Sequence, residues 1–250
     1  MKKYVYPLIS LAVIFTIWEI VILIFNIPEF LLPQPSSILV LFVNTIGTMI
    51  PHFAITFSEA ILGFFLAVII GILLSVIFEL SEIAKKSLYP YVIVIRIAPV
   101  IAIAPFLILW FGNGIMSKIM TASIMSIFFI IVSLTKGFSE VDSDSLDLMK
   151  SISASKWQIL TKLKMPNAVP YLFSGLKMAV ATSVAGAVVA EFVGSNEGLG
   201  YFILTNFYYL KTTQMFSALL FLFIGGMTFF GLVSLIENKF FKKYNIGEKF

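Results

Sequence analysis

The longest polar stretch of this chain, residues 140–170, reads EVDSDSLDLMKSISASKWQILTKLKMPNAVP. Within it, apolar residues recur every three positions, as on helices with one apolar face: Leu146, Met149 and Ile152, then Trp157, Leu160 and Leu163. A loop that only connects its neighbours does not need such a pattern. We therefore expect two short helices outside the membrane that present an apolar stripe to another protein.

The composition places the rest of the chain in a lipid bilayer. Of its 250 residues, 60% are hydrophobic and 12% are charged, whereas a soluble domain has about 25% charged residues. The mean hydropathy is +1.03. Several apolar runs reach the ~20 residues that a membrane helix needs, and they do not alternate as barrel strands do. The expected fold class is an all-α polytopic membrane protein with about six transmembrane helices.

The predicted spans are at about residues 4–25, 53–78, 89–111, 115–134, 171–193 and 215–236. Between them we expect an interfacial helix over 36–50, a polar loop over 79–87, a tight turn at 112–114 and a mixed loop over 194–214. The charged start and the first apolar run could form a secretory signal. That run is too long for one and no small-residue cleavage site follows it, so we expect a retained membrane helix.

The basic residues predict the orientation. Six spans put both termini on one side, and thirteen of the 17 basic residues then lie at the termini or in the loops 79–88 and 136–169. The remaining four are Arg96, Lys118, Lys177 and Lys211. By the positive-inside rule, those loops and both termini are expected in the cytoplasm. The basic excess is thus a topology signal, and nucleic acid is not an expected partner.

Several kinds of chemistry are excluded. The chain has no cysteine and a single histidine, His52, so neither a thiol site nor a site with several imidazoles fits within one subunit. No Gly-Lys pair occurs, so no P-loop lysine can hold ATP. An intramembrane enzyme would need a nucleophile with a base, or a metal cluster, and no His-Glu-x-x-His motif is present. We expect no catalytic residue, no metal and no cofactor in this chain.

Helix-capping residues divide the polar stretch into two helices. Asp144 and Asp147 form a weak variant of the capping box that can begin the first helix. Ser155 and Gln158 form a regular capping box at the start of the second helix. That helix should end before Pro166, because proline disfavours the helical conformation of the preceding residue. A loop that merely connects two spans is the alternative, and it would need no such caps.

The polar stretch resembles the EAA loop of ABC importer permeases. The matching residues are 147–155, 157–158, Lys162, 165–166, Ala168 and Pro170. Segments elsewhere, in order over nearly the whole chain, are similar to the nitrate/sulfonate/taurine-type subfamily: 32–36, 96–99, 105–112, 190–194 and 198–201. Two departures stand out. The acidic-Ala-Ala start of the family is Asp147-Leu148-Met149 here, and Ser153, at the bend with Ala154, replaces the usual glycine.

The resemblance implies a type I ABC importer fold, with residues 1–250 as one transmembrane permease domain and a coupling loop at about 138–169. It implies a homodimer in the cell membrane, cytoplasmic ATPase subunits that bind ATP and Mg²⁺, and an external substrate-binding protein. The residues expected to dock on the ATPase are Asp147, Leu148, Met149, Ser153, Ala154, Ser155, Trp157, Leu160 and Pro166.

Four residues inside the spans are candidates for the solute pathway: Arg96, Pro99, Ser183 and Glu191. Arg96 precedes Pro99 and Pro105, which free backbone carbonyls and bend the helix. Its alternative roles are snorkelling to the interface and structural pairing with an acid. We hypothesise that Glu191 either holds the loop 194–200 or lines the mouth of the path.

The fifth span has an unusually small-sided face, made by Ala181, Ser183, Ala185, Gly186, Ala187 and Ala190. Such residues suit close helix packing, at a dimer interface or around the pathway. Glu19 and Glu59 lie nearer the ends of their helices, and we interpret both as structural.

The function expected from these features is import of a small solute. The cargo is either a nitrate-, sulfonate- or taurine-like anion or a heterocycle like a thiamine precursor or riboflavin. The alternative is a secondary transporter that is not coupled to an ATPase. Transporters of that class often show interrupted helices at matching positions of two repeats, and the two halves of this chain do not.

Overall fold

The computed structural model describes residues 2–244, and this part of the chain is helical with short connections. Met1 and residues 245–250, which the predicted single domain includes, lie outside the described part. The elements are α1 (Lys2–Phe25), α2 (Pro35–Leu80), α3 (Glu82–Ile97), α4 (Val100–Phe111), α5 (Ile115–Ser139), α6 (Ser143–Ser151), α7 (Lys156–Ile159), the π-helical turn η1 (Leu160–Lys164), α8 (Met165–Gly194), α9 (Leu199–Tyr208) and α10 (Thr212–Tyr244).

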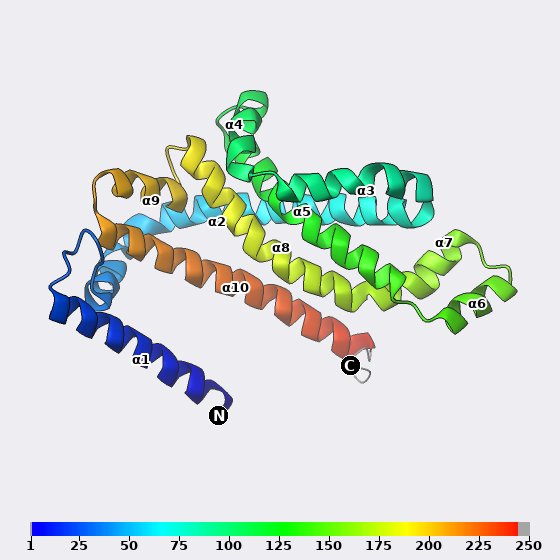
Figure 1. Ribbon diagram of the computed structural model, residues 1–250, viewed down its shortest axis with the longest axis horizontal. Coiled ribbons are helices and arrows are strands. Elements are labelled where there is room, and N and C mark those ends of the chain that lie inside the picture. The colour runs from blue at the N-terminus through cyan, green and yellow to red at the C-terminus, as the bar shows by residue number, and fades with distance from the viewer. Residues whose placement is uncertain (1, 245–250) are drawn as a thin grey trace.

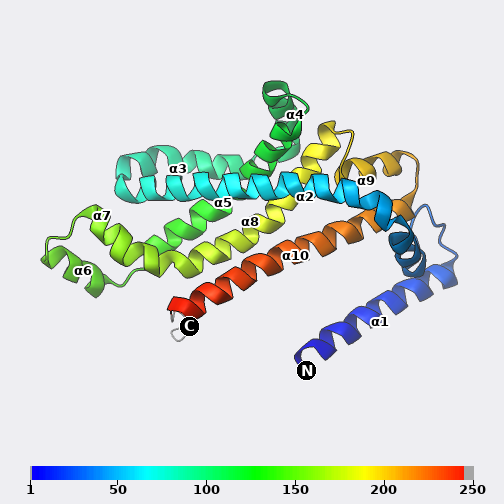
Figure 2. The same ribbon diagram turned by 180° about the vertical axis from the view of Figure 1, so that it is seen from behind.

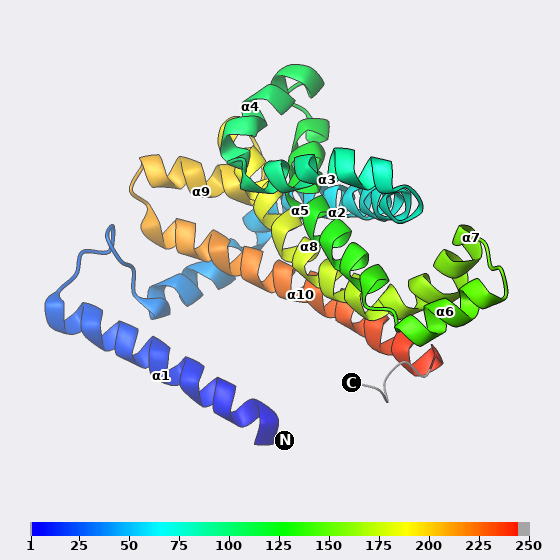
Figure 3. The ribbon, with the colours of Figure 1, turned by 45° about the vertical axis from the view of Figure 1, so that its right-hand side comes forward.

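The helices confirm the expected membrane fold. In the described part, five are long and apolar enough to cross a bilayer, or six if α3 and α4 together count as one span. Helices α5 and α8 lie side by side along much of their length, and α2 packs against both (Figures 1 and 3). Helices α6 and α7 protrude at the opposite end of the molecule from α9 (Figure 1).

The core depends on a close approach of three backbones at Ala122 of α5, which is completely buried. A Cβ added to Gly63 of α2 would lie 2.5 Å from the Ala122 Cβ, and one added to Gly186 of α8 would lie 2.7 Å from its Cα. Lipid tails are as apolar as leucine, so helices in a bilayer associate through such close packing. Gly186, Ala187 and Ala190 of the small face of α8 are thus packed within the chain, whereas Ala181 and Ala185 are exposed. A role of this face at a dimer interface or around the pathway stays a prediction.

Helix α2 corrects one prediction. The expected interfacial helix over 36–50 and the span over 53–78 form a single helix of 46 residues that contains Pro51. Proline removes one hydrogen bond and bends a helix without always ending it, and the first part of α2 is tilted away from the rest (Figure 2). Ser36, near the start of α2, lies within the helix, and its N–H and hydroxyl donate to Glu19 of α1 at 3.1 and 2.7 Å.

The third span is also different from the prediction. The polar loop expected over 79–87 is reduced to Ser81, whose hydroxyl caps α3 by accepting the Ala84 N–H at 3.2 Å. The expected span over 89–111 is broken into α3 and α4, which meet at 106°. Proline disfavours helical backbone in the residue before it, and Ala98, before Pro99, is extended. The bend expected from the prolines is therefore confirmed, but a continuous span is not.

The last third of the chain is more helical than expected. The region 194–214, predicted as a mixed loop, contains α9, which follows Gly198. Ten residues are too few to cross a bilayer, so hydropathy alone does not reveal such a helix. Helix α10 continues to Tyr244, beyond the predicted end at 236.

Helix α1 has few contacts with the rest of the chain. It is joined to α2 through Glu19 and to α10 through Trp18, whose ring centroid lies 5.7 Å from that of Phe216. Elsewhere its described side chains are largely exposed, and the helix diverges from the bundle (Figures 1 and 2).

Two glycine variants test the role of close packing. We expect Gly63→Ala to lower stability by about 1–3 kcal/mol, because its Cβ overlaps Ala122. Gly226→Ala in α10 is the matched control, since no atom lies within 4 Å of its added Cβ. Alanine is the better helix former, so this change should be neutral or stabilising by ~0.5–1 kcal/mol. Thermal unfolding in detergent measures both, and equal effects would contradict the packing argument.

Candidate functional site

The protruding end of the molecule is built on capped helices. The N-cap of α6 is Asp142, whose carboxylate accepts hydrogen bonds from the N–H and the hydroxyl of Ser145, both at 3.1 Å. The hydrogen bonds from Ser145, above all the one from its backbone N–H, hold the pKa of Asp142 below its usual range. The prediction that Asp144 caps this helix is therefore wrong. Asp144 lies in the first turn of α6. Several neighbouring residues can act as caps, and the spacing alone does not choose among them.

The second helix begins as predicted. The Ser155 hydroxyl accepts the Gln158 N–H at 3.2 Å, and the Gln158 Oε1 accepts the Ser155 N–H at 2.8 Å, so the capping box is complete. The bend expected at Ser153 and Ala154 is confirmed, since Ser153 has a φ of 54°. A left-handed residue other than glycine costs roughly 1–2 kcal/mol, which the two flanking caps help to offset.

This end exposes large apolar side chains. Leu148, Ile152 and Trp157 are 65%, 67% and 58% exposed. Leu160, by contrast, is buried in a cluster with Leu134, Phe138 and Ala168. Among the other expected docking residues, Asp147, Ser153, Ser155 and Pro166 are exposed, and Met149 and Ala154 are half-buried. Leu160 therefore anchors the loop to the bundle and has no free surface of its own.

The loop is joined to the bundle without a break. The second helix does not end before Pro166 as predicted, because the π-helical turn η1 connects α7 to α8 and the Met165 N–H bonds to the Leu160 carbonyl. π-Turns within helices are frequent at functional sites. Lys164 of this turn forms an ion pair with Glu79 at the end of α2, at 2.6 Å.

A second polar cluster lies at the opposite end, around Glu191 of α8. Its Oε1 accepts the Thr56 hydroxyl at 2.6 Å, and its Oε2 accepts the Gly200 N–H at 2.5 Å. The Thr56 oxygen in turn accepts the Leu199 N–H at 2.8 Å. Glu191 is almost fully buried, and a buried carboxylate needs such donors. Glu191 thus holds the start of α9, as one version of our hypothesis expects.

The glycines of this loop are required by Glu191. Gly198 has a φ of 101°, and a Cβ there would overlap the Glu191 carboxylate. A Cβ on Gly200 would lie 2.7 Å from the Glu191 Oε2. His52 fixes the loop from the other side, where its Nδ1 accepts the Gly198 N–H at 3.1 Å.

Two further ionisable groups lie beside Glu191. The Lys118 Nζ donates to the backbone oxygen and the Oδ1 of Asn113, at 2.6 and 3.0 Å, and so holds the turn before α5. The carboxyl group of Glu59 lies next to that of Glu191 and within electrostatic reach of Lys118. Sequence reasoning treated Glu59 as merely structural and assigned Lys118 no role. The signal that both residues carry is an ionisable group near the same end of adjacent membrane helices.

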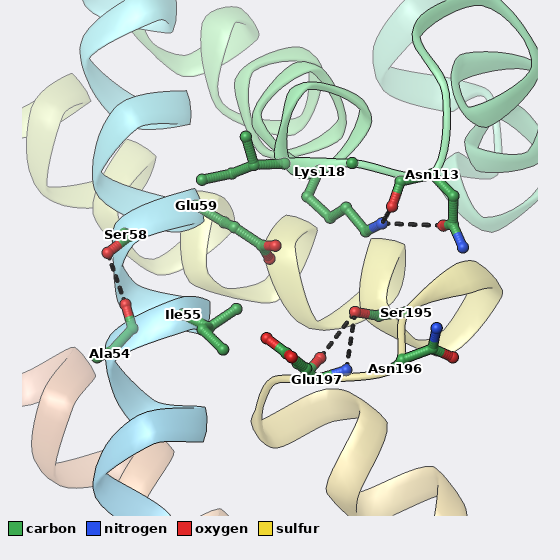
Figure 4. Close-up of a pocket in the computed structure, with 11 residues that line it drawn as sticks. Ala54, Ile55, Ser58, Glu59, Asn113, Lys118, Ser195, Asn196 and Glu197 are labelled. Carbon is green, nitrogen blue, oxygen red and sulfur yellow. Dashed lines mark hydrogen bonds between the residues drawn. The ribbon is translucent and has the colours of Figure 1, made fainter.

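These residues border an open cavity of 510 Å³ (Figure 4). It is lined by Ala54, Ile55, Ser58 and Glu59 of α2, by Asn113, Gly114, Ile115 and Lys118 at the start of α5, and by Ser195, Asn196 and Glu197 after α8. Figure 4 shows the Glu59 and Lys118 side chains directed toward it from different helices.

The structure does not bring the four expected pathway residues together. The Arg96 guanidinium lies over the Phe129 ring, 5.1 Å from its centroid, and is exposed like Pro99 at the bend between α3 and α4. Ser183 is buried and donates to the Val180 carbonyl at 2.9 Å. None of the four lines the cavity, and Glu191 lies behind it, beside the carboxyl group of Glu59.

Comparison with known proteins identifies similar sequences over nearly the full length. Residues 67–242 match the family described as "Binding-protein-dependent transport system inner membrane component". A probable ABC transporter permease of Haemophilus influenzae is 32% identical over 86% of this chain and 88% of its own. The formylaminopyrimidine transport permease of Halalkalibacterium halodurans is 30% identical over 93% of both chains. A putative aliphatic sulfonates transport permease of Bacillus subtilis is 28% identical over 95% of this chain and 87% of its own.

Solved structures share the fold. An inward-facing methionine ABC transporter superposes with a TM-score of 0.67 at 18% identity, covering 80% of this chain and 97% of the other. An amino acid ABC transporter with histidines superposes with a TM-score of 0.64 at 17% identity, covering 79% of this chain and 96% of the other. At these identities, the likeness establishes the arrangement of helices alone.

The loop-holding role of Glu191 can be tested by hydrogen exchange. In Glu191→Ala, the buried Gly200 N–H loses its acceptor, which costs about 1–3 kcal/mol, and the Thr56 hydroxyl retains only the His52 carbonyl, at 3.2 Å. The amides of residues 198–200 should therefore exchange at least tenfold faster. The control is Glu197→Ala, since that side chain is exposed. Wild-type exchange rates in Glu191→Ala would show that the carboxylate does not hold the loop.

Proposed function

Because this chain belongs to the family of binding-protein-dependent transport system inner membrane components, we propose that it moves a small nitrogen- or sulfur-containing solute into the cell. It is a multi-pass permease subunit of an ABC importer in the inner membrane, and ATP is hydrolysed by a separate subunit. Similar permeases are named for formylaminopyrimidine, aliphatic sulfonates, riboflavin, taurine and nitrate. These names support an anion or a heterocycle as the cargo class.

In this proposal α6 and α7 are the coupling element that docks on the ATPase. One observation carries it: Leu148, Ile152 and Trp157 are all more than half exposed on a rigidly capped loop that protrudes from the bundle. Large apolar side chains gathered on an otherwise polar surface mark a site of protein interaction. Resemblance to the EAA loop supports the same role. ATP and Mg²⁺ would then be bound by the ATPase and not by this chain.

The orientation and the assembly follow from this assignment. The α6–α7 end and both termini face the cytoplasm, and the end with Glu191 faces outward, toward the substrate-binding protein. A second copy of the chain completes the passage. This is supported by α4, which at 12 residues is too short to span alone and exposes Leu109 and Trp110 at 77% and 69%.

Docking can be tested by co-purification with the ATPase subunit. We expect the double variant Leu148→Glu/Trp157→Glu to lose the ATPase, because two charges would replace exposed apolar side chains of the docking surface. The matched control is Ile83→Glu, which changes an even more exposed apolar residue outside the loop. If the double variant keeps the ATPase, the loop is not the docking element.

The ion pair between Lys164 and Glu79 is expected to transmit the movement of the loop to α2. Lys164→Met should leave ATPase binding intact but lower solute uptake about tenfold, since coupling energies are typically 1–3 kcal/mol. The charge-swapped variant Glu79→Lys/Lys164→Glu should recover most of the uptake. Uptake and ATP hydrolysis are measured in proteoliposomes that contain the full transporter. Normal uptake by Lys164→Met would exclude this role.

A further inference from the structure

The carboxyl groups of Glu59 and Glu191 share a buried hydrogen bond between α2 and α8. Only 3% and 1% of the surfaces of these residues are exposed. An ionised carboxylate has acceptor oxygens and no donor, so two carboxyl groups can hydrogen-bond to each other only if one of them carries a proton. The contact therefore implies a proton that is held between two helices, at a depth where a second charge would be costly.

The neighbours of the pair indicate which group carries this proton. Glu191 already accepts the Thr56 hydroxyl and the Gly200 N–H, as an ionised carboxylate does. The buried Oε2 of Glu59, by contrast, has no hydrogen-bond partner in the described part of the chain. A buried oxygen without a partner is more costly when it is charged. Glu59 is therefore the neutral acid that donates, and Glu191 is the carboxylate that accepts.

The charges around the pair agree with a single proton. Lys118 of α5 lies within electrostatic reach of both carboxyl groups, and its one charge balances one carboxylate but not two. The other titratable groups that face the pair are His52, on α2 itself, and Glu197, which lines the same cavity. Helix α9 contributes backbone N–H groups, α4 contains no titratable residue, and those of α10 lie beyond residue 236, toward its far end.

We propose that Glu59 and Glu191 share one proton, and that this proton keeps the loop between α8 and α9 closed against α2. The inference goes beyond the proposed function. Loss of the proton would place a second negative charge beside Glu191, where the two charges are close and poorly solvated and repel each other. Because Glu191 holds the start of α9 through Gly200, this repulsion would release the loop. The loop lines one side of the cavity, so its release would widen the opening (Figure 4).

His52 gives the same loop an opposite dependence on pH. Its Nδ1 accepts the Gly198 N–H at 3.1 Å, and a protonated imidazole has no acceptor. Acidification would therefore loosen the loop through His52, whereas alkali would loosen it through Glu59. Raising the pH from neutral separates the two effects, because His52 can only remain neutral in that direction.

The proton can be detected by infrared spectroscopy, since a protonated carboxylic acid has a C=O stretching band that a carboxylate lacks. Spectra of the permease–ATPase complex in a detergent without ester groups are recorded from about pH 7 to about pH 10, above the ordinary carboxyl pKa of ~4.3. The wild type should show a band at the start that disappears as the pH rises. Glu59→Gln should lack that band throughout. The matched control Glu197→Gln, which removes an exposed carboxyl group from the same cavity, should keep it.

Hydrogen exchange of residues 198–200 tests whether the proton controls the loop. Protection factors remove the intrinsic effect of pH on exchange, and in the wild type they should fall at least about tenfold as the band disappears, because buried like charges repel strongly. In Glu59→Gln the amide group donates to Glu191 and has no proton to lose over this range, so protection should stay within about twofold. A merely structural role of Glu59 would give both proteins the same pH profile.

Three results would overturn the proposal. They are an infrared band that Glu59→Gln retains, wild-type protection that stays unchanged over the whole pH range, and a pH profile of Glu59→Gln that follows the wild type. If Glu59→Gln does not assemble, the two wild-type titrations decide the question. The band and the protection of residues 198–200 must then be lost with one midpoint, and different midpoints would contradict control of the loop by this proton.

Discussion

The close contact of α2, α5 and α8 around Ala122 is the constraint on which the rest of the structure depends. Gly63 and Gly186 remove the side chains that would hold the three backbones apart. In a bilayer, where apolar burial does not drive helices together, this packing is what aligns them. Because the helices are aligned, Thr56, Lys118 and Glu191 meet at one end, while Glu79 meets Lys164 at the other.

The same three helices connect the two candidate sites. At the protruding end, Leu160 and Ala168 are buried against α5, and the Asn167 amide donates to the Gly137 carbonyl at 3.1 Å. In the proposed function, a movement of α6 and α7 would therefore be passed directly to α8 and α5. At the other end, α8 carries the Glu191 carboxylate that holds α9. Tightly packed elements transmit displacement because their interfaces do not deform continuously.

Much of this architecture could be predicted from the sequence because its signals are local. The run lengths indicate the spans, and the Ser155–Gln158 capping box and the bend at Ser153 are where the pattern places them. The errors arise where tertiary contacts decide. Pro51 does not end α2, and Asp142 rather than Asp144 caps α6. The cavity could not be predicted, because Glu59 and Lys118 are distant in sequence and only the packing of α2 on α5 brings them together.

In the proposed orientation the end with Glu191 faces outward and the α6–α7 loop lies in the cytoplasm, and cysteine labelling tests this most directly. The chain has no cysteine, so Asn196→Cys and Lys156→Cys each introduce a single thiol at an exposed position at one of the two ends. A membrane-impermeant maleimide should label Asn196→Cys on intact cells, and Lys156→Cys only after the membrane is opened. Labelling of Lys156→Cys on intact cells, with Asn196→Cys protected, would contradict the account.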